Sequence, residues 1–180
     1  MTFKPRSTFL KILIPLLFIS LGVDAQHRKL TGNRVALDIQ VPVGEFASTH
    51  WIGFGVVYSP AIVHYKFLKH SVGLGYEGGI QYFLGNHASV SGYSHHYKAY
   101  TLAELMGGIA IKLTSRNAIG IYAGPGLSTY QGIFHFQYCA RAELSCSFKK
   151  KYFLAPGFFM NARSGTTGLW SAFLKAGMHF

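Results

Sequence analysis

Residues 34–44, with the sequence RVALDIQVPVG, carry the clearest structural signal in the chain because their side chains alternate in character. The apolar positions are Val35, Leu37, Ile39, Val41 and Val43, and the other face holds Ala36, Asp38, Gln40 and Gly44. Successive side chains of a β-strand point to opposite faces, so the alternation predicts a strand with one apolar face and one more polar face.

The same period of two recurs along the rest of the chain. It predicts seven further strands, at residues 51–67, 71–84, 98–113, 118–128, 132–138, 151–163 and 169–180. A bulge is expected at Ser59-Pro60, where the apolar set changes face and proline cannot donate to the ladder. The polar residues 85–97 predict an outer loop, and residues 114–117 predict a tight turn. Eight strands are enough to close a narrow barrel.

The composition favours a barrel whose apolar face meets lipid. The chain is 49% hydrophobic, 16% aromatic and only 13% charged, yet residues 26–180 contain no apolar run long enough for a membrane helix. Every backbone polar group must be paired within lipid, which leaves a closed barrel with its polar face inside. A soluble sandwich would give the same alternation with its apolar face inward, and a soluble periplasmic barrel that holds an apolar ligand is a further alternative.

Residues 1–25 have the organisation of a cleavable signal peptide. Three basic residues, Lys4, Arg6 and Lys11, precede an apolar segment at 12–21, and the small residue Ala25 stands at the expected cleavage site. The apolar segment has ten residues, well short of the about 20 that a helix needs to span a bilayer. We therefore expect two parts, a signal peptide at 1–25 and an outer-membrane β-barrel domain at 26–180.

The charge is strongly positive, with 17 basic and 6 acidic residues and a net charge of +11. Residues 1–25 hold three of the bases and one of the acids, which leaves 14 bases, 5 acids and a net charge of +9. Nucleic acid is the usual partner of such a chain, but export makes it improbable here. Outer-membrane lipid and lipopolysaccharide are the expected partners.

Three segments resemble the small outer-membrane β-barrel families that include OmpX-like and PorT-like domains. Residues 41–55 (VPVGEFASTHWIGFG) are similar to a first hairpin with a polar tip, and residues 119–126 (IGIYAGPG) are similar to a recurrent strand. Residues 170–180 (WSAFLKAGMHF) end on Phe180 and resemble the terminal signal that the barrel assembly machinery recognises. The resemblance implies an all-β, closed antiparallel transmembrane barrel in the cell outer membrane.

Several charged residues fall on the predicted inner face. The candidates for ion pairs in the lumen are Asp38, Glu77, Glu104, Lys112, Arg163 and Lys175. An eight-stranded interior is just wide enough for side chains, and unpaired buried charges are costly, so we expect a plugged lumen rather than an ion path.

The remaining candidate sites are weaker. Cys139 and Cys146 are the only cysteines, and an even number in an exported chain predicts a disulfide, with two free thiols as the alternative. His87 and Ser89 resemble the His and Ser of outer-membrane lipid A deacylases, but no acidic residue lies between Glu77 and Glu104 to orient the histidine. His95-His96 lacks the spacing of a zinc motif.

These patterns predict a non-enzymatic barrel with a plugged interior that contributes to the envelope or displays surface loops. No catalytic, cofactor-binding or metal-binding residue is expected. A lipid-modifying enzyme like a lipid A deacylase is the alternative from another class. An accessory of secretion or surface motility is a third possibility, implied only by the PorT-like resemblance.

Overall fold

The computed structural model describes residues 29–30, 32–60, 63–67, 70–90, 93–149, 151–163 and 168–180. The expected signal peptide at 1–25 lies outside the described residues, and its cleavage stays a prediction. Among the described residues, no helix has the length and apolarity needed to cross a membrane.

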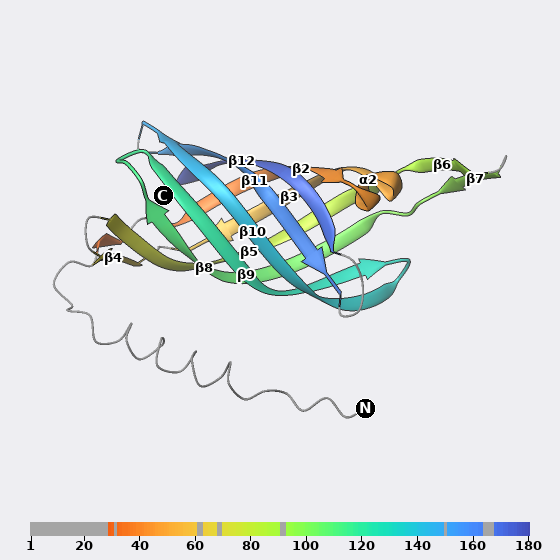
Figure 1. Cartoon of the computed structure of the whole chain (residues 1–180), viewed down its shortest axis with the longest axis horizontal. Helices are drawn as coiled ribbons and strands as arrows, with labels where there is room; N and C mark the ends of the chain where they lie inside the picture. Colours follow the sequence, from red (N-terminus) through yellow and green to blue (C-terminus); the bar gives the residue numbers. More distant parts are fainter. Residues whose placement is uncertain are drawn as a thin grey trace, which may run out of the picture.

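Eight antiparallel strands form a closed barrel (Figure 1). Around the ring they are β5 (His70–Gly85), β3 (His50–Ser59), β2 (Arg34–Val43), β12 (Leu169–His179), β11 (Tyr152–Ala162), β10 (Ile133–Phe148), β9 (Asn117–Tyr130) and β8 (Tyr100–Lys112). The ring closes because β8 pairs with β5, from Ser71 opposite Lys112 to Phe83 opposite Tyr100. The predicted fold class is confirmed.

The predicted break near Ser59-Pro60 divides one strand position into two strands. Tyr58 at the end of β3 pairs with Gly78 of β5, and Val63 at the start of β4 (Val63–Phe67) pairs with Leu74 of the same strand. β4 therefore continues β3 along β5, and the short β1 (Lys29–Leu30) pairs with β4 at its outer edge.

Two elements project at one end of the barrel, which we call the loop end. The strands β6 (His87–Val90) and β7 (Tyr93–His96) pair into a hairpin that extends beyond the barrel (Figure 1). The expected outer loop at 85–97 is thus largely a β-hairpin. The expected polar tip of the first hairpin contains a short helix, α2 (Glu45–Thr49), which buries Phe46 against the barrel interior.

The opposite end, which we call the terminal end, holds the start of β2 and the end of β12. The predicted turn at 114–117 lies here, where the Thr114 Oγ1 accepts hydrogen bonds from the Arg116 and Asn117 amides at 3.2 and 3.0 Å. At the loop end, Gln131 and Gly132 have φ values of 54° and 80°, the positive pair that a two-residue hairpin turn requires.

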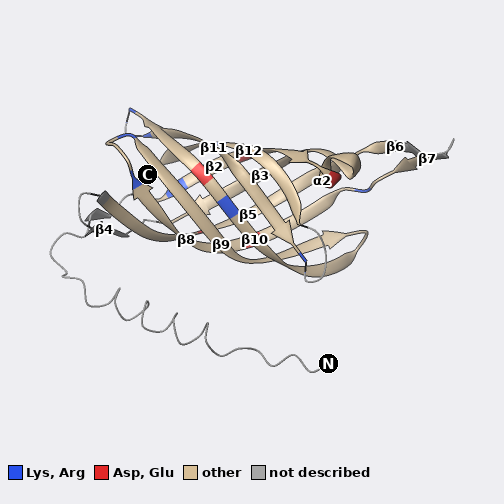
Figure 2. Cartoon of the chain, in the orientation of Figure 1, with Lys and Arg blue, Asp and Glu red and all other residues tan. Residues whose placement is uncertain are grey.

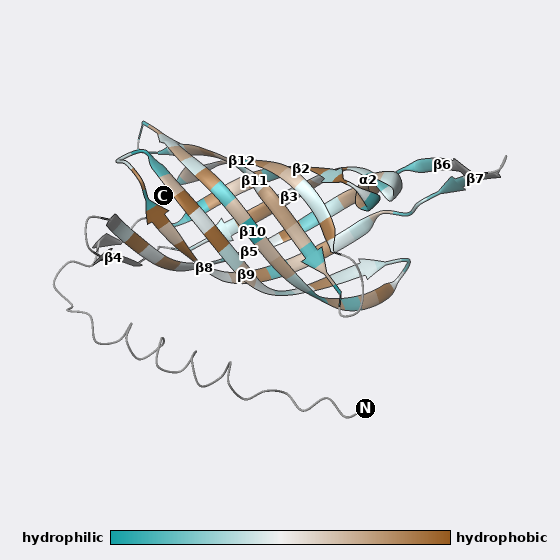
Figure 3. Cartoon of the chain, in the orientation of Figure 1, coloured by the Kyte–Doolittle hydropathy of each residue, from teal (hydrophilic) through white to brown (hydrophobic). Residues whose placement is uncertain are grey.

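The two faces of the strands follow the predicted alternation, visible as bands of hydropathy along the strands (Figure 3). Leu37 and Ile39 on β2 are 67% and 46% exposed, whereas Asp38 between them is 1% exposed. The same inversion recurs on β12, where Leu174 is exposed and Lys175 is buried. At these positions the large apolar side chains face outward and the charged ones face inward, the arrangement typical of a barrel in lipid.

One strand is longer than its sequence suggested. The expected strand at 132–138 is only the first part of β10, which continues to Phe148 and pairs with β9 as far as Cys146. Its second half places Arg141, Glu143 and Ser145 on the inner face.

Candidate functional site in the barrel lumen

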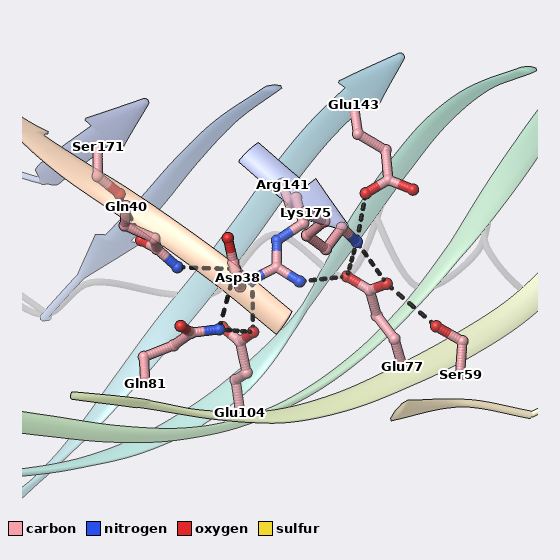
Figure 4. Close-up of polar contacts among 10 residues, drawn as sticks. All are labelled: Asp38, Gln40, Ser59, Glu77, Gln81, Glu104, Arg141, Glu143, Ser171 and Lys175. Atoms are coloured by element: carbon pink, nitrogen blue, oxygen red, sulfur yellow. Dashed lines mark hydrogen bonds and ion pairs between the residues drawn. The ribbon is translucent and has the colours of Figure 1, made fainter. Parts of the chain in front are cut away.

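Six charged side chains meet in the middle of the lumen, and we call them the charge network (Figure 4). The network consists of Asp38, Glu77, Glu104, Arg141, Glu143 and Lys175. They come from five strands, β2, β5, β8, β10 and β12, and none of them is more than 6% exposed. Each occupies an inward position of its strand, and the register of the strands sets them at similar heights in the lumen.

Arg141 is the centre of the charge network. Its Nη1 donates to Glu77 Oε1 at 2.6 Å, and its Nη2 donates to Glu104 Oε1 at 2.6 Å and to Asp38 Oδ2 at 3.3 Å. The guanidinium also lies over an aromatic ring, 5.1 Å from the centroid of Phe173. One cation therefore connects β10 to β2, β5 and β8 across the lumen.

Lys175 is the second cation of the network. Its Nζ donates to Glu77 Oε2 at 3.1 Å and forms an ion pair with Glu143. Glu77 thus receives both cations, one on each carboxylate oxygen. Because four carboxylates face two cations, Glu77 is the carboxylate whose charge is most fully matched.

Neutral polar side chains add hydrogen bonds to the network. Gln40 and Gln81 each donate an Nε2 hydrogen to Asp38 Oδ2 at 3.1 Å. Gln81 reaches Asp38 across Gly55, which stands between them in the sheet, and a Cβ at Gly55 would overlap the Gln81 amide. Ser59 donates to Glu77 Oε2 at 3.4 Å.

An aromatic cluster fills the lumen from the charge network towards the loop end. Its buried members are Phe46, Phe83, Tyr100, Leu102, Met106, Tyr122, Cys139, Phe159 and Phe173. Tyr100 Oη donates to Gln137 Oε1 at 2.8 Å, and Gln137 Nε2 donates to Ser128 Oγ at 2.7 Å, so the polar groups inside this cluster are also bonded. Ions, hydrogen bonds and rings together occupy the interior.

Of the six predicted lumen residues, four lie in the charge network and two lie at exposed strand ends. Asp38, Glu77, Glu104 and Lys175 lie in the charge network. Lys112 and Arg163 do not, which corrects the prediction for those two. Lys112 is the last residue of β8 at the terminal end and Arg163 follows β11 at the loop end, so both side chains are exposed.

Sequence reasoning missed Arg141 and Glu143, because the predicted strand ended at residue 138. The signal was present in Ala140-Arg141-Ala142-Glu143-Leu144-Ser145, where a polar residue occupies every second position. Alanine is a weak marker of a lipid-facing position, and the two flanking cysteines suggested a disulfide-closed loop instead.

The predicted disulfide is wrong. Cys139 and Cys146 are both free and lie on the same strand, β10. Seven residue steps along an extended strand place their Cα atoms roughly 23 Å apart, whereas a disulfide needs Cα atoms within about 7 Å. Cys139 faces the lumen and Cys146 has the opposite parity, so no small adjustment joins them.

The histidines His87, His95 and His96 lie on the β6–β7 hairpin. His87 pairs with His96, and their ring centroids are 4.1 Å apart. Neither strand of the hairpin carries a carboxylate that could orient His87. Within the part of the chain that the structure describes, no group of three or more His, Cys, Asp or Glu side chains is arranged to hold a metal ion.

Phe180 lies at the terminal end, directly after β12. Its amide donates to the Asn33 carbonyl at 2.9 Å, and its side chain is 64% exposed. The backbone therefore continues the pairing of β12 with β2, while the ring stays outside. Recognition of Phe180 during assembly stays a prediction.

No family model matches the chain, and no curated protein sequence matches it. Solved structures do. The outer membrane protein Ail of Yersinia pestis in a phospholipid bilayer nanodisc has a TM-score of 0.54 at 12% identity, over 83% of this chain and 99% of Ail. The N-terminal β-barrel domain of Pseudomonas aeruginosa OprF has a TM-score of 0.54 at 14% identity, over 84% of this chain and 100% of the domain.

The outer membrane enzyme PagL is similar to the same degree, with a TM-score of 0.55 at 9% identity, over 82% of this chain and 99% of PagL. At such identities the likeness concerns the fold, and it includes proteins of different kinds. The chain has the fold of the small outer-membrane β-barrel proteins.

Proposed function

We propose that this protein is a non-enzymatic outer-membrane β-barrel with a plugged interior, which contributes to the envelope and displays the β6–β7 hairpin and α2 outside the cell. The observation that carries the proposal is the charge network, in which Arg141 bonds carboxylates of three other strands. Buried ion pairs of this kind are side-chain packing, and they leave the middle of the lumen without a path for ions.

The outward faces support a place in a membrane. The exposed side chains around the barrel include Leu37, Val56, Ile80, Leu105, Ile121 and Leu174, which would be unfavourable in water as one continuous belt. The signal peptide expected at 1–25 and the likeness to outer-membrane barrels favour the outer membrane. Lipopolysaccharide and outer-membrane phospholipid would then be the molecules around the belt. We also propose that the chain is related to the OmpX-like or PorT-like barrels, which would allow an accessory role in secretion or motility.

A lipid-modifying enzyme is the second candidate, favoured by His87 and Ser89, which stand two positions apart on one strand, and by the fold likeness to an outer-membrane enzyme. A nucleophilic serine needs a base within hydrogen-bond reach and a group that orients the base. β6 and β7 supply histidines but no carboxylate, so the non-enzymatic reading accounts better for the hairpin.

Two measurements on cells that produce the full chain test the proposal. Fractionation should recover the protein in the outer membrane, with a gel mobility that changes on heating. Recovery as a soluble protein that needs no detergent would contradict it. Lipid A mass spectra from cells with the protein, with the His87→Ala variant and without the protein should be the same. A change in acylation that depends on His87 would establish the enzyme instead.

A further inference from the structure

The terminal end of the lumen opens into a cavity of about 100 Å³, which we call the terminal mouth. Its lining includes the cations Arg34, Lys112 and Arg116, the imidazole of His179, and the hydroxyl groups of Ser145 and Ser147 on β10. All the lining residues that the structure describes lack a carboxylate. Figure 2 shows basic residues gathered at this end of the barrel.

Arg34 is the buried part of this lining. It is 7% exposed, and its guanidinium lies 5.4 Å from the centroid of the Phe153 ring. One Nη2 hydrogen goes to Tyr122 Oη at 3.4 Å, but the Nε is buried and has no hydrogen-bond partner in the described structure. A buried cation with an unused donor is costly, and a bound anion would remove that cost.

The nearest acids of the interior are already engaged. Glu143 lies two residues before Ser145 on the inner face of β10, and Lys175 pairs with it. Cations and hydroxyl donors therefore line the mouth together, and no carboxylate in the described lining neutralises the cations. Lys112 and Arg116 are exposed, which leaves them open to a ligand that arrives from water.

We propose that the terminal mouth binds a phosphate-type oxyanion, with Arg34 as the buried anchor and Lys112 and Arg116 as the outer clamp. Charged donors and hydroxyls are the groups that bind phosphate oxygens most strongly. The cavity of about 100 Å³ has room for one such group. The phosphate comes either free from solution or from the headgroup of an anionic lipid at the rim, and these two sources share the same chemistry.

The experiment titrates inorganic phosphate into the purified full barrel in phosphatidylcholine nanodiscs at constant ionic strength, with amide NMR shifts of Ser145 and Ser147 as the local readout. We expect saturable shifts, weakened about tenfold or more in Arg34→Gln and in Lys112→Gln, as expected for loss of a charge-assisted hydrogen bond. Lys98→Gln is the matched control, because Lys98 is an exposed lysine at the loop end. It should titrate like the unmodified protein.

A second arm uses nanodiscs that contain phosphatidylglycerol, without added phosphate. The same shifts in this arm alone would identify a lipid headgroup as the source of the anion, and shifts in the phosphate arm would identify an anion from solution. The proposal is overturned if neither arm gives saturable shifts, or if Lys98→Gln weakens the response as much as Lys112→Gln. Because Lys112 is exposed, its variant stays informative even if Arg34→Gln does not fold.

Discussion

The middle of the lumen and its terminal mouth are built from the same strands, yet they treat charge in opposite ways. In the middle, Arg141 and Lys175 face four carboxylates, and all six groups are buried. At the mouth, Arg34, Lys112 and Arg116 face hydroxyl groups and open space, with no carboxylate in the described lining.

The difference follows from access to water. A charge in the middle of an eight-stranded barrel cannot be hydrated, so it is tolerated only with partners. The exposed Lys112 and Arg116 at the mouth keep their water and need no partner. Charges in the middle therefore hold strands together, while charges at the mouth remain available for a ligand.

Arg141→Met should have the largest effect on the barrel. The variant leaves Asp38, Glu77 and Glu104 without their shared cation, and removing one partner of a buried ion pair costs about 3–5 kcal/mol. Arg116→Met at the mouth is the matched control and should change the free energy of unfolding by less than about 0.5 kcal/mol. Urea-induced unfolding in lipid, followed by loss of the heat-modifiable band, measures both. Equal effects would remove the distinction between the two regions.

Leu74→Arg tests the outer, lipid-facing surface of the barrel. Leu74 is an outward position of β5, and a cation on the lipid-facing side costs up to about 2–4 kcal/mol, the upper limit applying at mid-bilayer depth. Gly75→Ser changes the next position, which has inward parity, and should be milder because it adds a polar group to the polar face. The yield of folded protein in the outer membrane compares the two. Similar losses would show that the assigned faces are wrong.

The carboxylates should differ among themselves by smaller amounts. Glu77→Gln should be the most destabilising because Glu77 bonds both Arg141 and Lys175. Glu104→Gln should be milder because Glu104 bonds Arg141 alone among the cations and the network has more acids than bases. Glu45→Gln, in the exposed helix α2, should stay within about 0.5 kcal/mol of the unmodified protein. The midpoint of urea unfolding ranks them, and an order in which Glu45 leads would contradict the account.

The sequence predicted most of this arrangement because a barrel imposes one rule on every strand. The eight strand positions were correct, and so were the inward and outward faces in the middle of the barrel, from Leu37 and Asp38 on β2 to Leu174 and Lys175 on β12. The length of β10 and the places of Lys112 and Arg163 were not. The alternation is harder to recognise where outward positions hold small residues, as at Ala140 and Ala142. For that reason the inward place of the central cation Arg141 was not predicted.

Features that depend on more than alternation were harder to predict. The helix α2 follows Gly44, whose φ is 61°, and no periodic signal precedes such a short element. The ends of strands are another case, since Lys112 has inward parity but lies where β8 reaches water. Partner choice within the lumen depends on which side chains reach across it, and strand pattern alone does not contain that information.

The plugged lumen is the central claim, and conductance across a planar bilayer tests it most directly. The purified full barrel should give no steady conductance, because Arg141 and Lys175 connect the strands with side chains that are almost entirely buried. Arg141→Met should show increased current if it still inserts, since the variant removes the central connection. A stable, large and ion-selective conductance from the unmodified protein would contradict the plug and make this barrel a channel.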